Sequence, residues 1–362
     1  MTMLELMLIC SSLLSGGVVI EDGSIDGMDL TPYTEHYIPE DADLAVEDII
    51  SRARNFKPFP ELSPNFGLGV EEIWLKVTLK APANSSKYIL DFPYAPLDYV
   101  TVYLERNQMI QRVVQSGDRV PFSERSIPYR TTNVEISLDT SPTNVWIQIK
   151  TESSLQAQIL LFDRNAYGQH MASENAGLFF YYGLFLVMLI LNLLIYLSLR
   201  DRIYLPYILF LFSFVVFQSS VNGTLFQWVL PGFPRIVNGL LLFSLYTALG
   251  AGLYFCQLFT DLKNIAPRLN AFSDLAWKLA AVGAFISLSI PYRFGLAITV
   301  ALGCIVPTIA MISGILSLRS GRREARFYLI AWLAFILGTI IFALKTTGLL
   351  PSIFLTNYGM QI

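Results

Sequence analysis

The chain has 362 residues, of which 54% are hydrophobic and 15% charged, and its mean hydropathy is +0.51. Soluble domains carry about 25% charged residues, so this composition argues against an ordinary cytoplasmic enzyme. Residues 1–173 hold 13 basic and 23 acidic side chains, a net charge of −10, whereas residues 174–362 hold 12 and 5, a net charge of +7. We therefore expect one part to fold in water and the other in a bilayer. Nucleic acid is not expected as a partner of so acidic a first part.

Cysteine and histidine are too few to build a metal or disulfide framework. Cys10, Cys256 and Cys304 all lie in apolar segments without a CxxC spacing, and the two histidines, His36 and His170, stand far apart. We expect no metal site, no cofactor and no histidine-based catalysis.

Residues 1–24 predict an export signal or an N-terminal anchor. The apolar run of residues 1–20 ends in small residues, as the cleavage end of a secretory signal does. Glu5 stands where a basic residue is expected, so an uncleaved anchor stays open.

Residues 25–170 predict an extracytoplasmic all-β domain, a jelly-roll-like antiparallel sandwich. Residues 73–80 alternate strictly between apolar and polar side chains, which is the period of a half-buried strand. The same period recurs, between turn-forming residues, in the segments 87–92, 99–105, 109–115, 133–138, 144–151 and 156–162. One short helix is expected at 45–54, with Asp43 available as its cap.

The outward faces of these strands carry aromatic rings beside polar groups. Such rings suit the apolar faces and hydroxyls of sugars, or a hydrophobic amino acid or peptide. The candidate ligand-binding residues are Trp74, Lys76, Tyr103, Trp146 and Gln148. The alternative is that the aromatic rings pack beneath loops or against the membrane part.

Four carboxylates are candidates for glycoside chemistry, namely Asp91, Asp98, Asp118 and Glu124. They have no defining spacing, so solvated or turn-forming roles are favoured. We therefore expect no catalytic residues.

Residues 175–362 predict an α-helical polytopic membrane domain. Each of six apolar stretches is long enough to cross a hydrocarbon core of about 30 Å as a helix. Their limits are 176–198, 203–222, 236–259, 273–290, 295–317 and 326–347, and residues from 357 resemble the start of a seventh span. With a seventh span the C-terminus would lie in the cytoplasm, where an output domain could act.

The connections between the spans set the orientation. Eight basic residues follow spans one, three and five, whereas the opposite connections hold only Arg235, Arg293 and Lys345. By the positive-inside rule the richer side is cytoplasmic, which agrees with an exported N-terminal domain. The eight are Arg200, Arg202, Lys263, Arg268, Arg319, Arg322, Arg323 and Arg326.

Few polar residues lie inside the spans. Gln218, Asn222 and Asn238 fall in the outer third of their helices and could line a pocket beneath the sandwich, although hydrogen bonds between helices would account for them equally well. No Asp or Glu lies deep in a span, Lys278 can snorkel to the interface, and Pro307 is expected to interrupt span five. Proton-coupled pumping is thereby disfavoured, while a facilitator stays open.

Several segments, in their order and spacing, resemble the bacterial seven-transmembrane receptors with diverse intracellular signalling modules, with their type 2 extracellular domain. In the first part the resemblance rests on IEDGSIDGMDLTPY (20–33), EEIWLKVTLKAP (71–82), DFPYAPLDYVTVYL (91–104) and SGDRVPFSERSIPYR (116–130). In the second part it rests on residues 181–210, SGRREARFYLIAW (320–332) and the terminal NYGMQI (357–362). It covers about residues 25–362.

The resemblance implies a periplasmic sensory domain similar to carbohydrate-binding jelly rolls, a bacterial inner-membrane location and a transducing helical core. In most relatives the output is a cytoplasmic diguanylate cyclase, histidine kinase or phosphatase, which here would lie beyond Ile362 or on a partner protein. The expected partners are a small-molecule ligand such as a sugar, the lipid bilayer, the output domain in cis or in trans, and a second copy in a homodimer. The alternative function is a membrane facilitator whose ectodomain captures substrate.

Overall fold

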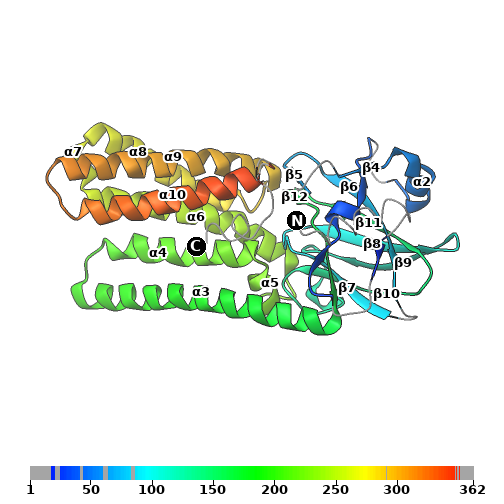
Figure 1. Ribbon diagram of the computed structural model, residues 1–362. Coiled ribbons are helices and arrows are strands. Elements are labelled where there is room, and N and C mark those ends of the chain that lie inside the picture. Colours follow the sequence, from blue (N-terminus) through cyan, green and yellow to red (C-terminus); the bar gives the residue numbers. More distant parts are fainter. Residues whose placement is uncertain are drawn as a thin grey trace, which may run out of the picture. The chain divides into compact units, whose positions relative to one another are not determined.

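The computed structural model describes residues 18–20, 25–40, 44–59, 64–82, 86–290, 292–346, 348 and 350, and these form two compact units (Figure 1). The first, here the β-unit, contains the described residues up to Glu174, the segment Phe226–Pro234 and the described residues from Lys345 onward. The second, here the helical unit, contains Asn175–Leu225 and Arg235–Leu344. The predicted seventh span, from residue 357, lies outside the described residues.

The β-unit is built from two main sheets. The larger has the order β4-β3-β6-β11-β8-β9, with β1 paired in parallel to β6, and the smaller has the order β10-β7-β13-β2. All the other described pairings are antiparallel, including a small pair of β5 with β12. The all-β prediction is thereby confirmed. The strands are β1 Val18–Val19, β2 Met28–Asp29, β3 Glu35–Tyr37, β4 Lys57–Pro58, β5 Asn65–Gly67, β6 Glu72–Lys80, β7 Ser86–Phe92, β8 Tyr99–Arg106, β9 Met109–Ser116, β10 Thr132–Leu138, β11 Thr143–Lys150, β12 Leu155–Gln156 and β13 Leu160–Asp163.

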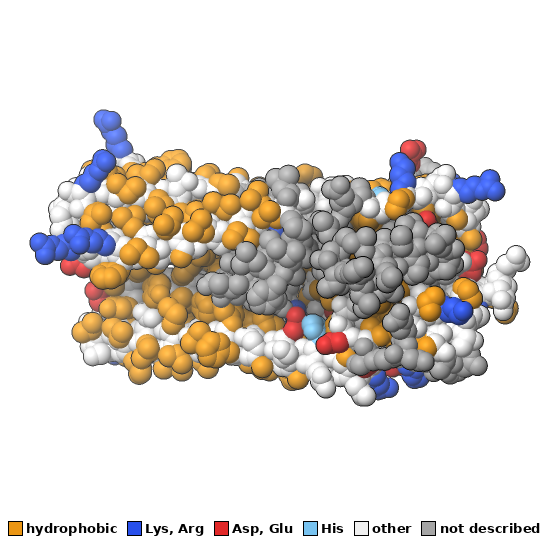
Figure 2. All heavy atoms as spheres, in the orientation of Figure 1, with side chains coloured by type: hydrophobic (Ala, Val, Ile, Leu, Met, Phe, Trp, Pro, Cys, Tyr) orange, Lys and Arg blue, Asp and Glu red, His pale blue; other side chains and the backbone are white. Residues whose placement is uncertain are grey.

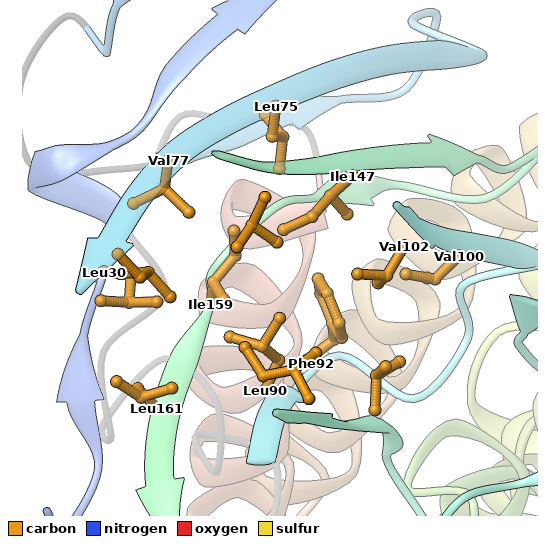
Figure 3. Packing of buried hydrophobic residues seen from close by; sticks show 14 of the residues in the cluster. Leu30, Leu75, Val77, Leu90, Phe92, Val100, Val102, Ile147, Ile159 and Leu161 are labelled. Carbon is orange, nitrogen blue, oxygen red and sulfur yellow. The ribbon is translucent and has the colours of Figure 1, made fainter. Parts of the chain in front are cut away.

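The core of the β-unit lies between these two sheets. The inward residues of the large sheet, such as Leu75 and Ile147, face Leu90, Phe92 and Leu161 of the small sheet (Figure 3). All five are at most 1% exposed. Burying a side chain of this size contributes about 1.5–3 kcal/mol, so the alternating pattern of the sequence positions the main source of stability.

Two features of the N-terminal part depart from the predictions. Strand β1 lies inside the segment predicted as signal or anchor: Val18 pairs with Leu79, and the Ile20 N–H donates to the Lys80 carbonyl at 2.9 Å. Val18–Ile20 therefore belong to the β-unit, while residues 1–17 and 21–24 lie outside the described residues. The predicted helix at 45–54 is shorter, because α2 (Val46–Ser51) gives way to the 3-10 turn η2 (Ala53–Asn55).

Six described helices are long and apolar enough to cross a membrane, as predicted. They are α3 Arg164–Leu199, α4 Tyr204–Val221, α6 Pro234–Thr260, α8 Pro267–Ile286, α9 Tyr292–Arg319 and α10 Ala325–Thr346. The short helices α5 (Thr224–Trp228) and α7 (Leu262–Ile265) lie in connections. Helix α9 continues through Pro307, so the predicted interruption there is wrong.

Helix α3 begins twelve residues before the predicted span. Its first residues are too polar for a hydropathy window, but Asp163 caps them: Asp163 Oδ1 accepts hydrogen bonds from the N–H groups of Asn165 and Ala166, each at 2.8 Å. The helix therefore starts directly after β13.

Candidate functional site

The five predicted ligand-binding residues do come together on the outward face of the large sheet. The register places Trp146 of β11 opposite Lys76 of β6 and Tyr103 of β8, and Gln148 opposite Trp74. The Trp74 and Tyr103 rings stack with centroids 5.9 Å apart, and Lys76 Nζ lies 5.5 Å from the centroid of the Trp146 ring.

Both tryptophans lie on the outward face of the sheet, but neither is open to solvent. Trp74 and Trp146 are 0% and 1% exposed, because α2, η2 and Phe56 cover them. The Phe56 ring meets Trp146 edge-on at 5.4 Å. The aromatic rings thus form a second, smaller core on the outside of the sheet, and their burial follows the alternative in which they pack beneath a connecting segment.

Polar groups next to this second core are fixed by two glutamates. Glu72 Oε1 accepts hydrogen bonds from Trp74 Nε1 at 2.9 Å and from Gln148 Nε2 at 2.7 Å, while Glu72 Oε2 pairs with Lys150 Nζ at 3.3 Å. We call these four residues the Glu72 cluster. The side chains of Glu72 and Lys150 are 11% and 30% exposed, so the cluster presents a rigid carboxylate, an amide and an ammonium group at the edge of the covered aromatic face.

Glu105 holds the second indole in the same way. Its Oε2 accepts from Trp146 Nε1 at 2.8 Å and from Asn144 Nδ2 at 3.1 Å. Lys76 pairs with Glu35 at 3.4 Å. Each tryptophan is thus held by a neighbouring carboxylate as well as by packing.

Two of the candidate glycosidase carboxylates, Asp98 and Asp91, are held in separate settings. Asp98 Oδ2 pairs with Arg119 at 3.2 Å and accepts the Glu152 N–H at 2.9 Å. Asp91 accepts hydrogen bonds from Thr131 Oγ1 at 2.5 Å and Tyr167 OH at 2.8 Å. Asp91 is fully buried, and this burial raises its pKa to about 6.

A cluster that the residue patterns did not single out connects the segment 125–131 with α3. The Arg125 guanidinium is buried and donates from Nη1 to the carbonyls of Tyr129, Arg130 and Thr131 at 2.6–2.9 Å. Tyr129 OH donates to Glu174 Oε2 at 3.0 Å, and Arg130 pairs with the same carboxylate. We call Arg125, Tyr129, Arg130 and Glu174 the Arg125 joint.

The Arg125 joint also holds a segment that follows α4 in the sequence. The Arg125 guanidinium lies 5.3 Å from the ring centroid of Phe226, and Phe122 meets the same ring edge-on at 5.4 Å. Gln227 Nε2 donates to the Pro128 carbonyl at 3.3 Å. Both Phe226 and Gln227 are part of the β-unit.

A third attachment involves the C-terminal end of α10, whose last two residues also belong to the β-unit. Asn65 Nδ2 donates to the Lys345 carbonyl at 2.5 Å, and Ser154 Oγ donates to the Thr346 carbonyl at 3.0 Å. The Lys345 ammonium lies 5.6 Å from the Tyr94 ring centroid. Within the β-unit, three segments separated widely in sequence are therefore tied to the sandwich.

The hydrogen bonding of two of the three predicted membrane-pocket residues is informative. Gln218 is 3% exposed, and its Nε2 has no hydrogen-bond partner among the described residues. Asn222 Nδ2 donates to Tyr182 OH at 3.0 Å, and that hydroxyl is 3.0 Å from Thr224 Oγ1. Asn238 is half-buried near the start of α6. Hydrogen bonding between helices thus accounts for Asn222, and the pocket stays a prediction.

The β-sandwich and the six candidate spans define a class of protein, a multi-pass membrane protein with a folded domain outside its spans, and the family matches that follow make it a sensory receptor whose domain is extracellular. Residues 174–362 match the family model described as "7TM diverse intracellular signalling", and residues 31–163 match that described as "7TMR-DISM extracellular 2". The chain therefore belongs to the family of seven-transmembrane receptors with diverse intracellular signalling modules. No curated protein matches it.

Proposed function

We propose that this chain is the sensory and transmembrane portion of a bacterial signal-transduction receptor in the inner membrane, with the β-unit in the periplasm. The excess of basic residues after spans one, three and five supports this orientation. Ligand binding to the sandwich would change the relative free energies of two helix arrangements, and a cytoplasmic output such as a diguanylate cyclase or a histidine kinase, in cis or on a partner, would respond.

One observation carries this proposal. The Arg125 joint fixes Glu174, and Glu174 lies on the same helix that continues to Leu199 as a candidate span. A movement of the segment 125–131 would therefore act directly on α3. A catalytic site is not required for this role, because the signal is a difference in ligand affinity between two states.

The Glu72 cluster is the binding surface that we assign to a small polar ligand, with a carbohydrate as the first candidate. Its carboxylate and amide suit ligand hydroxyls, and the Tyr103 ring lies on the same face of the sheet. Trp74 and Trp146 would act beneath this surface by holding Glu72 and Glu105 in place.

Calorimetric titration of the full chain in nanodiscs with a panel of mono- and disaccharides tests this assignment. We expect the Gln148→Ala variant to lose about tenfold or more in affinity for any saccharide that binds, because a directed hydrogen bond is lost. Gln158→Ala, an amide bonded to Asp29 beside the smaller sheet, is the matched control and should bind as the wild type does. Equal heats from both variants would remove the Glu72 cluster from the proposal.

A further inference from the structure

An apolar groove of about 450 Å³ lies within the helical unit, and neither the sensory role nor the Arg125 joint uses it. Helices α4, α6 and α8 line the groove. Its lining includes small residues of α6 and α8, such as Gly250, Ala251 and Ala281, and aromatic residues farther along both helices. Because small side chains lie between larger ones, a groove runs along the helix surface.

The length of the groove fits one leaflet of a bilayer. Its lining on α6 runs from Phe243 to Tyr254, which is about 16 Å at 1.5 Å per residue. Half of a hydrocarbon core of about 30 Å is about 15 Å. Tyr254 lies near the end of α6 that carries the basic connections, so the groove runs from there to about the middle of the helix.

Two of the three polar side chains in the lining, those of Thr247 and Trp277, are already bonded within their own helices, and the third is the Tyr254 hydroxyl at one end. Thr247 Oγ1 donates to the Phe243 carbonyl at 2.7 Å, and Trp277 Nε1 donates to Asp274 Oδ1 at 3.0 Å. A water molecule or polar solute needs two or more partners in such a site. The groove therefore favours a flexible hydrocarbon over a polar solute.

Aromatic and basic side chains mark one end of the groove. The Tyr254 and Trp277 rings are 5.0 Å apart, and Lys278, which follows Trp277, pairs with Asp274 at 2.5 Å. Exposed Arg202 lies in the turn that leads into α4, three residues before the lining residue Leu205. Amphipathic rings next to cations are typical of the level of the lipid headgroups.

Figure 2 shows one face of the helical unit. Hydrophobic side chains cover much of the visible face of the helices, and Lys and Arg side chains, with some Asp and Glu side chains beside them, gather at the end where α9 joins α10. In the orientation proposed above, this end faces the cytoplasm. The charge complement of such a surface is an anionic headgroup.

We propose that this groove is a binding site for an anionic phospholipid of the cytoplasmic leaflet, with one acyl chain along α6 and the headgroup near Arg202. The assignment to the cytoplasmic leaflet rests on the membrane orientation given under the proposed function, and no other part of the proposal does. The occupant of the groove is independent of any ligand of the β-unit, so each proposal can fail alone.

The test uses the full chain in nanodiscs containing phosphatidylglycerol or phosphatidylcholine with a photoactivatable group on one acyl chain. Adducts are located by peptide mass spectrometry. We expect phosphatidylglycerol adducts to concentrate on α6 and α8 peptides around Thr247–Tyr254 and Ala281. Even labelling of all lipid-exposed helix faces would overturn the proposal.

Two alanine-to-phenylalanine substitutions separate a specific site from general lipid contact. Ala281→Phe fills the groove and should lower the α6 adduct yield by about fivefold or more, whereas Ala334→Phe on the exposed face of α10 should leave it unchanged. If Ala281→Phe fails to fold, Ala281→Leu tests the same space with a smaller side chain. Equal yields from the filled and control variants would contradict the site.

The headgroup is tested separately. Arg202→Gln should abolish the excess of phosphatidylglycerol over phosphatidylcholine adducts and leave the phosphatidylcholine yield unchanged. Equal labelling by both lipids in the unsubstituted chain would overturn the anionic part of the proposal.

Discussion

The two units of this chain differ in how much of their hydrophobic side-chain surface is buried. Core residues of the β-unit such as Leu90 are fully buried between two sheets, whereas in α3 and α10 only 6% and 11% of the most apolar window is buried. In water, burial of side chains is what holds the sandwich together. In a bilayer, lipid solvates the exposed leucines, so helix contacts depend on close packing and on polar pairs. The same substitution should therefore have different effects in the two units.

The largest expected difference is between two leucine-to-alanine changes. Leu90→Ala, in the sandwich core, should lower the free energy of unfolding of the β-unit by about 3 kcal/mol, because it leaves a cavity. Leu333→Ala, at a position of α10 that is 51% exposed, should change stability by less than about 0.5 kcal/mol. Hydrogen exchange of the full chain, read on peptides of each unit, measures both effects. Equal losses of unfolding free energy in the two variants would contradict the conclusion that water surrounds one unit and lipid the other.

The next effect concerns a buried carboxyl group of the β-unit. Because burial raises the folded-state pKa of Asp91 to about 6, the folded protein binds this proton more tightly than the unfolded chain does. The unfolding free energy should therefore fall as pH rises from about 4 through about 6, by up to about 3 kcal/mol.

Asp91→Asn should remove this part of the pH dependence, and the wild-type-minus-variant difference in denaturation midpoint between pH 4 and 7 measures it. Glu47→Gln, at an exposed position on α2, is the control and should retain the wild-type slope. If the Asp91→Asn variant keeps an unaltered slope, Asp91 does not titrate in this range.

The smallest expected effect lies in the helical unit. Gln218→Leu should raise stability by about 1 kcal/mol, because it removes a buried amide nitrogen that has no partner among the described residues. Asn222→Leu should lower stability by a similar amount, since it breaks the bond to Tyr182. Thermal unfolding in detergent compares the two variants. If Gln218→Leu lowers the unfolding temperature as much as Asn222→Leu does, the Gln218 amide makes a stabilising hydrogen bond and the prediction is wrong.

Sequence patterns predicted the long strands and the spans because each has a strong period or a long apolar run. They missed β1 to β5, whose two or three residues obtain their pairing from distant partners such as β6. They also placed the start of α3 too late, because the polar residues that follow Asp163 have no apolar run of their own.

For the candidate site, strand alternation correctly assigned the face of Trp74 and Trp146 but not their exposure. Alternation shows on which side of a sheet a residue lies, and only the fold shows that Phe56 returns to cover it. The Arg125 joint was missed for a related reason. By composition alone, Arg125 and Glu174 are typical of surface charges. The segment that contains Arg125 was part of the resemblance to the receptor family, but the resemblance predicted no contact for it.

Helix α3 contains no proline between Arg164 and Leu199, so all of its residues share one rotational phase. Each added residue would turn everything beyond it by about 100° and advance it by about 1.5 Å. The distance in sequence from Glu174 to the span therefore sets the angle, about the axis of α3, between the Glu174 side chain and each side chain of the span. In two receptors with identical sandwiches and identical spans, one additional residue between Glu174 and the span would place a different side of the span on the Glu174 side of the helix.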